Sequence, residues 1–120
     1  MPLSTSGETT VLTALLASRF VSLHTASPGN TGASEVTGGA YARQSATFTQ
    51  AGNNPTVASN SGIITYPTAT ASWGTVTHFG LWSAASGGTF YGYGTVTTPK
   101  AIDIDDIARW DIGQLTVSTD

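Results

Sequence analysis

The stretch TVTHFGLWSAASGGTFYGYGTVT, Thr75–Thr97, decides the fold class of this chain. Polar and apolar residues alternate along 75–83 and again along 89–97, which is the two-residue period of a β-strand. The residues between them, 84–88, are alanine, serine and glycine, a composition typical of a hairpin loop. The stretch therefore predicts an antiparallel hairpin.

The same alternation predicts which side chains share a face. On the first strand, Phe79 and Leu81 should lie on one face, opposite Val76, His78 and Trp82. On the return strand, Tyr91 and Tyr93 should lie on one face, opposite Phe90, Gly92, Gly94 and Val96. Because glycines on one face let a large ring come close, Trp82 or Trp73 should fill the space above them.

Shorter strands are expected on both sides of the hairpin, at 20–25, 41–50, 57–59, 63–66, 107–112 and 115–119. Turns are expected at 51–55 and 113–114, a break at 98–100, and a long loop at 26–39. Many short strands with frequent turns predict an all-β fold, an antiparallel β-sandwich or jelly-roll-like domain. Residues 1–120 should form one domain. Its expected core positions are Leu12, Leu16, Val21, Leu23, Phe48, Ile64, Phe79, Leu81, Ile112 and Val117.

One α-helix is expected, in the N-terminal segment 1–19. Thr5 and Glu8 have the spacing of a capping box, in which each side chain accepts a hydrogen bond from a free backbone N–H group. An apolar stripe follows at helical spacing, made of Val11, Leu12, Leu15 and Leu16. The helix should run from about residue 6 to residue 18 and pack its apolar face on the sheet or on a neighbouring molecule.

Charged residues make up only 9% of the chain, against about 25% in average globular proteins. The four basic residues are scattered, at Arg19, Arg43, Lys100 and Arg109, and the net charge is −3, so nucleic-acid binding is not expected. Cysteine is absent, which excludes disulfides and thiolate metal sites. No apolar run approaches the ~18 residues of a membrane helix. The N-terminal segment is not expected to be a signal peptide, because its apolar stretch 11–16 is short and follows no basic segment.

The sequence contains few of the residue patterns that enzymes use for catalysis. The nucleophile elbow Gly-x-Ser-x-Gly does not occur. The only histidines, His24 and His78, are expected to be strand residues that are hydrogen-bonded at an interface or at the surface. We therefore expect no enzymatic activity and no cofactor.

The most metal-like segment is Asp103-Ile104-Asp105-Asp106. Counted as a calcium loop from Asp103, it has acidic residues at the first and third positions, but Ala108 replaces the required glycine and Gln114 the bidentate glutamate. Asp103, Asp105 and Asp106 are therefore weak candidates for an irregular cation site, and a solvated turn without an obligatory metal is preferred.

Four aromatic residues are candidates for an interface or a ligand: Trp73, Trp82, Tyr91 and Tyr93. Aromatic rings stack on sugars and anchor protein interfaces, but in β-proteins they more often fill the core, which is the preferred interpretation. Exposure of these rings on one face would favour a carbohydrate-binding module, and complete burial would disfavour it.

Three segments, in order along the chain, resemble a family of small tailed-phage and prophage proteins that are labelled tail fibre proteins. They are LHTASPGNTG at 23–32, EVTGGAYARQ at 35–44 and WGTVTHFGLW at 73–82, followed by LTV at 115–117. The resemblance implies a virion protein, assembled in the cytoplasm of the host bacterium, whose partners are capsid, fibre or tail components. A compact domain without heptad or collagen repeats suits head decoration, or the base or one bead of a head or tail fibre. The alternative is a receptor- or carbohydrate-binding module of a tail fibre or tail tip that recognises a host surface glycan.

Self-association is also expected. Few charges protect the sheet edges, the loop 26–39 could be ordered by packing on another copy, and the helix stripe could be buried there too. Closed symmetry avoids open-ended growth, and the resemblance implies a trimer.

Overall fold

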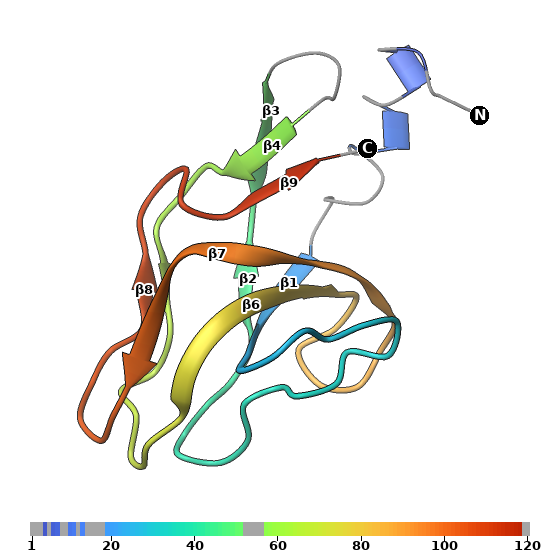
Figure 1. The fold of residues 1–120 in the computed structure, drawn as a ribbon. Coiled ribbons are helices and arrows are strands. Elements are labelled where there is room, and N and C mark those ends of the chain that lie inside the picture. Colours follow the sequence, from blue (N-terminus) through green and yellow to red (C-terminus); the bar gives the residue numbers. More distant parts are fainter. Residues whose placement is uncertain are drawn as a thin grey trace.

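A computed structural model describes residues 4, 6–7, 10–11, 13, 19–51 and 57–118 of the 120-residue chain. The described part is built from β-strands (Figure 1): β1 (Arg19–His24), β2 (Gln44–Ala46), β3 (Phe48–Ala51), β4 (Val57–Asn60), β5 (Ile64–Thr65), β6 (Gly74–Trp82), β7 (Phe90–Ile102), β8 (Arg109–Trp110) and β9 (Thr116–Ser118). Every strand pairing is antiparallel, so the predicted all-β class is confirmed.

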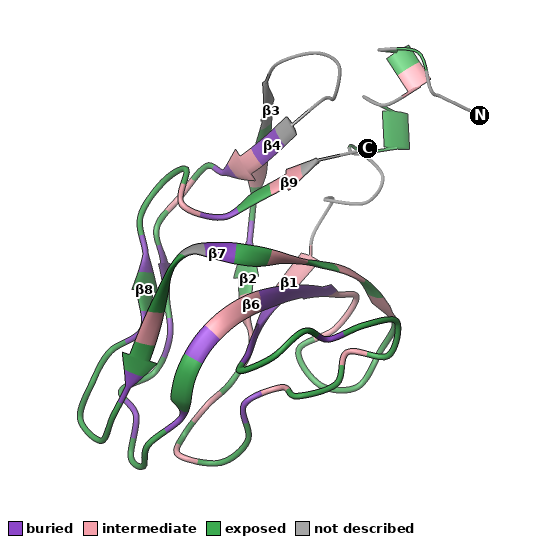
Figure 2. Cartoon of the chain, in the orientation of Figure 1, coloured by how far each residue is buried: buried purple, intermediate pink, exposed green. Residues whose placement is uncertain are grey.

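The strands form three sheets. The largest has the order β2-β1-β6-β7 and contains the predicted hairpin, β6–β7, which curves through the middle of Figure 1. A three-stranded sheet has the order β3-β4-β9, and β5 pairs with β8 in a two-stranded ribbon. One core of buried apolar side chains draws members from all three sheets, a sandwich-like arrangement. Figure 2 shows the buried positions concentrated in β1 and β6, the two central strands of the largest sheet.

Most of the residues that were expected in the core are buried or partly buried there. Five of them are buried: Val21, Leu23, Ile64, Phe79 and Leu81. Phe48 and Val117 are partly buried and pack against the core, whereas Leu12 and Leu16 lie outside the described residues. Ile112 was wrongly expected there: it is 65% exposed, because it lies in the turn after β8, and Leu115 is buried instead. The largest buried side chains that were not expected are Trp110 and Tyr66.

The β6–β7 hairpin departs from strict alternation at two irregularities. Val76 was expected to share a face with His78, but it is fully buried in the core with Phe79, because the register shifts between Val76 and His78. Leu81 pairs with Gly92, but Trp82 pairs with Phe90, so β7 has an extra residue at Tyr91.

The extra residue reverses the expected face of Phe90. Its ring packs on Trp82, with ring centroids 5.1 Å apart, whereas a side chain at Gly94 would point at the core residue Phe79. The ring that fills the space above Gly94 is therefore Phe79, and not Trp82 or Trp73 as expected. A β-carbon on Gly94 would lie 2.9 Å from the Phe79 ring.

Other strand boundaries also differ from the expectation. The predicted strand 41–50 is divided into β2 and β3, and β7 continues through 98–100, where a break was expected. The predicted strand 107–112 shortens to β8. Strands β8 and β9 do not pair with each other, because β8 pairs with β5 and β9 pairs with β4.

The expected helix over 6–18 falls largely outside the described residues. Residues 6–7, 10–11 and 13 are described there with helical backbone, and they do not by themselves support a helix of that length. The expected turn at 51–55 also lies mostly outside them. Within the described part of the chain, no helix is long and apolar enough to cross a membrane.

Candidate functional site

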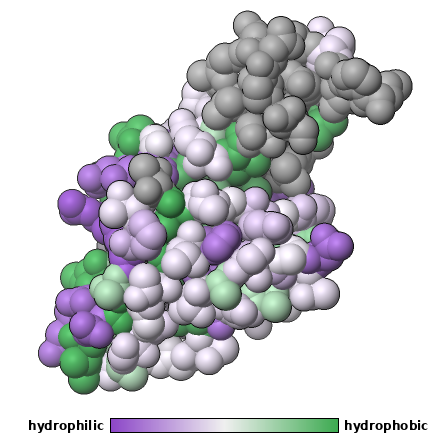
Figure 3. All heavy atoms as spheres, in the orientation of Figure 1, coloured by the Kyte–Doolittle hydropathy of each residue, from purple (hydrophilic) through white to green (hydrophobic). Residues whose placement is uncertain are grey.

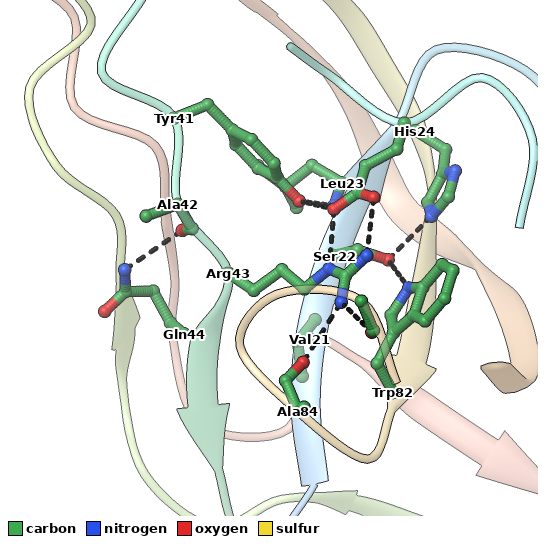
Figure 4. A network of polar contacts seen from close by, with 12 residues as sticks. Val21, Ser22, Leu23, His24, Tyr41, Ala42, Arg43, Gln44, Trp82 and Ala84 are labelled. Carbon is green, nitrogen blue, oxygen red and sulfur yellow. Dashed lines mark hydrogen bonds and ion pairs between the residues drawn. The ribbon is translucent and has the colours of Figure 1, made fainter. Parts of the chain in front are cut away.

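The most developed polar arrangement surrounds Arg43, at the point where the loop 25–43 returns to the largest sheet (Figure 4). The guanidinium group holds the Glu35 carboxylate with two hydrogen bonds, from Nε to Oε2 at 2.8 Å and from Nη2 to Oε1 at 2.9 Å. Nη1 donates to the carbonyl oxygens of Ala84 at 3.0 Å and Gly87 at 2.9 Å. The Arg43 side chain is only 8% exposed. We call Arg43, Glu35, Tyr41 and Trp82 the Arg43 clamp.

The indole ring of Trp82 packs against the guanidinium group of Arg43. The centre of the guanidinium group lies 3.8 Å from the centroid of the indole ring, a cation–π contact. The same ring leaves no room for a side chain at Gly32, where a β-carbon would lie 2.4 Å from Cζ2 of Trp82. Gly32 also has a φ of +76°, so both space and backbone conformation require glycine.

Tyr41 connects the clamp to β1. Its hydroxyl accepts a hydrogen bond from the backbone N–H of Leu23 at 3.0 Å and donates one to Glu35 at 2.7 Å. Burial, followed by this bond to a carboxylate, raises the pKa of the Tyr41 hydroxyl. For Glu35, burial acts to raise the pKa, but the hydrogen bonds from Arg43 and Tyr41 and the guanidinium charge outweigh it, so the carboxyl pKa is lowered. The hydrogen bond to Glu35 raises the pKa of Arg43. The pair is therefore ionised.

His24 continues the network, to which Ser22 connects Trp82; this histidine was expected at an interface or at the surface, but it is fully buried. Nδ1 of His24 lies 2.8 Å from the carbonyl oxygen of Ala33, which can only accept, so Nδ1 carries a proton. Ser22 accepts a hydrogen bond from the indole Nε1 of Trp82 at 2.9 Å and lies 2.6 Å from Nε2 of His24. Burial lowers the pKa of His24, so Nε2 is unprotonated and accepts from the Ser22 hydroxyl.

The polar network fixes a long loop onto the chain's own sheet. Besides the clamp, the backbone N–H of Val36 donates to Leu23 at 2.9 Å, and that of Thr25 donates to Ser34 at 3.2 Å. The loop 26–39, which was expected to be ordered by a second copy, is thus ordered by its own β1. Arg43 also ties this loop to the hairpin loop 83–89.

The four candidate aromatic residues are not brought together. Trp73 is buried, donates from Nε1 to Gly39 at 2.9 Å, and packs edge-on against Tyr41 and Tyr66. It therefore belongs to the core, and Trp82 belongs to the clamp.

Tyr91 and Tyr93 are 43% and 46% exposed, but they do not share one face as expected. Tyr93 pairs with Gly80 and approaches His78, on the face opposite the core residues Phe79 and Leu81. Tyr91 lies under Arg19, which is two residues from the core-facing Val21 and therefore on the same face of β1 as Val21. The extra residue in β7 separates the two rings, so they do not form one continuous aromatic platform.

The three candidate aspartates lie in an exposed turn. A carboxylate oxygen of Asp106 accepts from the backbone N–H of Asp103 at 2.9 Å, and Ser72 donates to Asp103 at 3.4 Å. Asp105 has a φ of +71° and donates its backbone N–H to Ala69 at 2.7 Å. Among the residues that the structure describes, no three His, Cys, Asp or Glu side chains gather in a way that could hold a metal ion.

Sequence reasoning missed Arg43, Glu35 and Tyr41 as functional residues. The available signal was their place in the segment 35–44, one of the three segments 23–32, 35–44 and 73–82 that carry the resemblance. The clamp and the histidine beneath it join these same three segments in space.

A family model described as Podophage GP4 fiber I protein gp80 matches residues 5–118 of the chain. No curated protein matches the chain. The match covers nearly the whole sequence and agrees with the resemblance to phage tail fibre proteins. The chain therefore belongs to the podophage GP4 fiber I protein gp80 family, and it is a fibre-type structural protein of a phage particle.

Proposed function

We propose that this chain is a rigid structural module on the outside of a tailed-phage particle, at the base of a head or tail fibre, as one bead of it, or as decoration of the head. Its role is to support assembly or stability of the particle. It is assembled in the cytoplasm of the host bacterium and contacts other capsid, fibre or tail proteins.

The Arg43 clamp is the observation that carries this proposal. Its charged and aromatic side chains are occupied in holding two loops on one sheet, an arrangement that makes the domain stiff. The histidines are engaged in the same way, since His24 is buried and bonded at both nitrogens, and Nδ1 of His78 contacts Thr77 at 2.8 Å. These features fit a structural role that requires no catalysis, no cofactor and no nucleic acid.

Self-association around a closed symmetry axis, as a trimer, completes the proposal. A module that repeats around an axis gives a fibre base its symmetry and covers sheet edges that carry few charges.

Locating the chain in the virion tests the proposal. Purified particles should contain the chain, and imaging of particles that carry a tagged copy should show the tag on a fibre or on the head surface. Infectious particles that lack the chain altogether would contradict it.

The alternative, a receptor- or carbohydrate-binding module, is favoured by the exposure of Tyr91 and Tyr93. Because these rings face different sides, a sugar could stack on only one of them at a time. Binding to host surface glycans that is lost in Tyr93→Ala or Tyr91→Ala would support this alternative, and no binding at millimolar glycan would count against it.

A further inference from the structure

An unusual group of exposed isoleucines lies at one end of the molecule. Ile63, Ile104, Ile107 and Ile112 are each 57–65% exposed, although isoleucine is among the residues most often buried in proteins. The chain has two further isoleucines, Ile64 and Ile102, and both are buried. We call the four exposed residues the isoleucine surface.

The β5–β8 ribbon brings these residues together. Ile64 pairs with Trp110, and both point into the core, so their neighbours along each strand face outward. Ile63 precedes β5 and Ile112 follows β8, which places both at one end of the ribbon. At the other end, the backbone N–H of Tyr66 donates to Ala108, next to Ile107.

The turn that carries Ile104 is held against the same end of the ribbon. The backbone N–H of Ala69 donates to Asp106 at 2.8 Å, and that of Asp105 donates back to Ala69 at 2.7 Å. In Figure 3 strongly hydrophobic and strongly hydrophilic colours lie next to each other along the left side, over β8 and its flanking turns. The apolar and charged residues thus occupy a common surface.

Charges of both signs surround the isoleucines. Apart from Arg19 and the Arg43–Glu35 pair, every charged side chain among the described residues lies at this end: Lys100, Asp103, Asp105, Asp106, Arg109 and Asp111. Arg109 and Asp111 form a solvent-exposed ion pair at 3.5 Å, with side chains 60% and 59% exposed. Such a pair contributes little to the fold, so its charges are free to serve a contact with another molecule.

A hollow of about 500 Å³ opens beside β8. Its lining includes Lys100, Ile107, Arg109 and Asp111, so apolar and charged groups meet around it. A side chain from another molecule can enter this hollow and be covered there, as at the centre of a protein interface.

We infer that the isoleucine surface is the contact between copies of this chain. A second copy fits because the surface carries both halves of a contact: in a closed ring of copies, the isoleucines of neighbouring copies cover one another and Arg109 of one copy faces the Asp103–Asp106 turn of the next. The inference rests on the self-association included in the proposed function, and it adds the place where the copies meet.

The double variant Ile104→Ser/Ile107→Ser tests the inference. Both side chains are exposed, so thermal melting should show that the variant folds, whereas self-association should weaken by about 100-fold because two apolar anchors are lost. The matched control is Tyr91→Ser/Tyr93→Ser, which removes two exposed apolar side chains away from the isoleucine surface and should leave self-association unchanged. Sedimentation velocity over a concentration series measures both variants.

A second variant tests the charges. Arg109→Asp places like charges opposite each other in the contact and should weaken self-association as well, more strongly at low salt. The inference is overturned if the native chain is a monomer at high micromolar concentration, if the isoleucine variant keeps the native mass, or if the tyrosine control dissociates equally. The virion role fails separately, if purified particles lack the chain.

Discussion

Replacing Arg43 by methionine should destabilise the domain strongly. Methionine keeps an apolar stem against Trp82 but removes all four hydrogen bonds of the guanidinium group. The Glu35 side chain, 19% exposed, is then left ionised without its partner. Removing one member of a buried ion pair costs about 3–5 kcal/mol, a large share of the roughly 5–15 kcal/mol that holds a small domain together.

Urea unfolding measures this loss. With a denaturant slope of about 1–3 kcal/mol per molar, the midpoint of Arg43→Met should fall by about 2 M. The control is Arg109→Met, which breaks the exposed pair with Asp111 and should cost less than about 1 kcal/mol. Glu35→Gln combined with Arg43→Met should recover about 1–2 kcal/mol relative to the single variant, because the unpaired charge is gone. An Arg43→Met variant no less stable than Arg109→Met would refute this account of the clamp.

Four further outcomes are expected. Burial holds the pKa of His24 below its ordinary 6.5, so the unfolded chain takes up the proton first and stability should decline as pH falls below about 6.5; a free energy of unfolding that stays level from pH 7.5 to pH 5.5 would contradict this. Gly32→Ala should destabilise more than Gly29→Ala, because both glycines have positive φ but only the first is in contact with an indole ring; equal melting temperatures would show that the contact does not matter. Thermal melting should be the same with and without a chelator, and a drop of several degrees would indicate a metal at Asp103–Asp106. Light scattering should give the mass of a trimer, and a monomer at high micromolar concentration, with isolated single copies on imaged particles, would contradict it.

The sequence predicted the elements that depend on local alternation. β1 and β6 were expected within one residue of their observed bounds, because Val21 and Leu23 in β1, and Phe79 and Leu81 in β6, recur at the two-residue spacing of a strand. The hairpin loop was expected for the same reason, from a local run of small residues.

The irregular features depend on contacts between distant positions. The extra residue at Tyr91 occurs where the Phe90 ring packs on Trp82. This contact joins two strands, so the alternation of residues along one strand does not predict it. The strand expected at 107–112 contains four apolar side chains, and two of them, Ile107 and Ile112, face solvent. The sequence pattern shows which residues are apolar. It does not show whether an apolar side chain is buried in the core or exposed on the surface.

The Arg43 clamp was not predictable by spacing for a related reason. Arg43 and Glu35 are eight residues apart, and the carbonyl groups that complete the site lie more than forty residues away. The burial that makes this pair strong arises only when the loop folds over Trp82. Besides the family resemblance of the segment 35–44, the low charge content of the chain was a second hint, because an arginine and a glutamate close in sequence stand out against it.

The anchoring of the long loop has a practical consequence for engineering. Gly32 is fixed under Trp82, and His24 is bonded to Ala33, so the loop is held firmly near its base. At its tip, Gly29 and Asn30 are exposed, and a β-carbon on Gly29 would meet no atom within 4 Å. Exposed loop tips of this kind accept inserted sequence most readily. A foreign peptide placed between Gly29 and Asn30 should leave the domain folded, which makes this tip a site for displaying peptides on the domain.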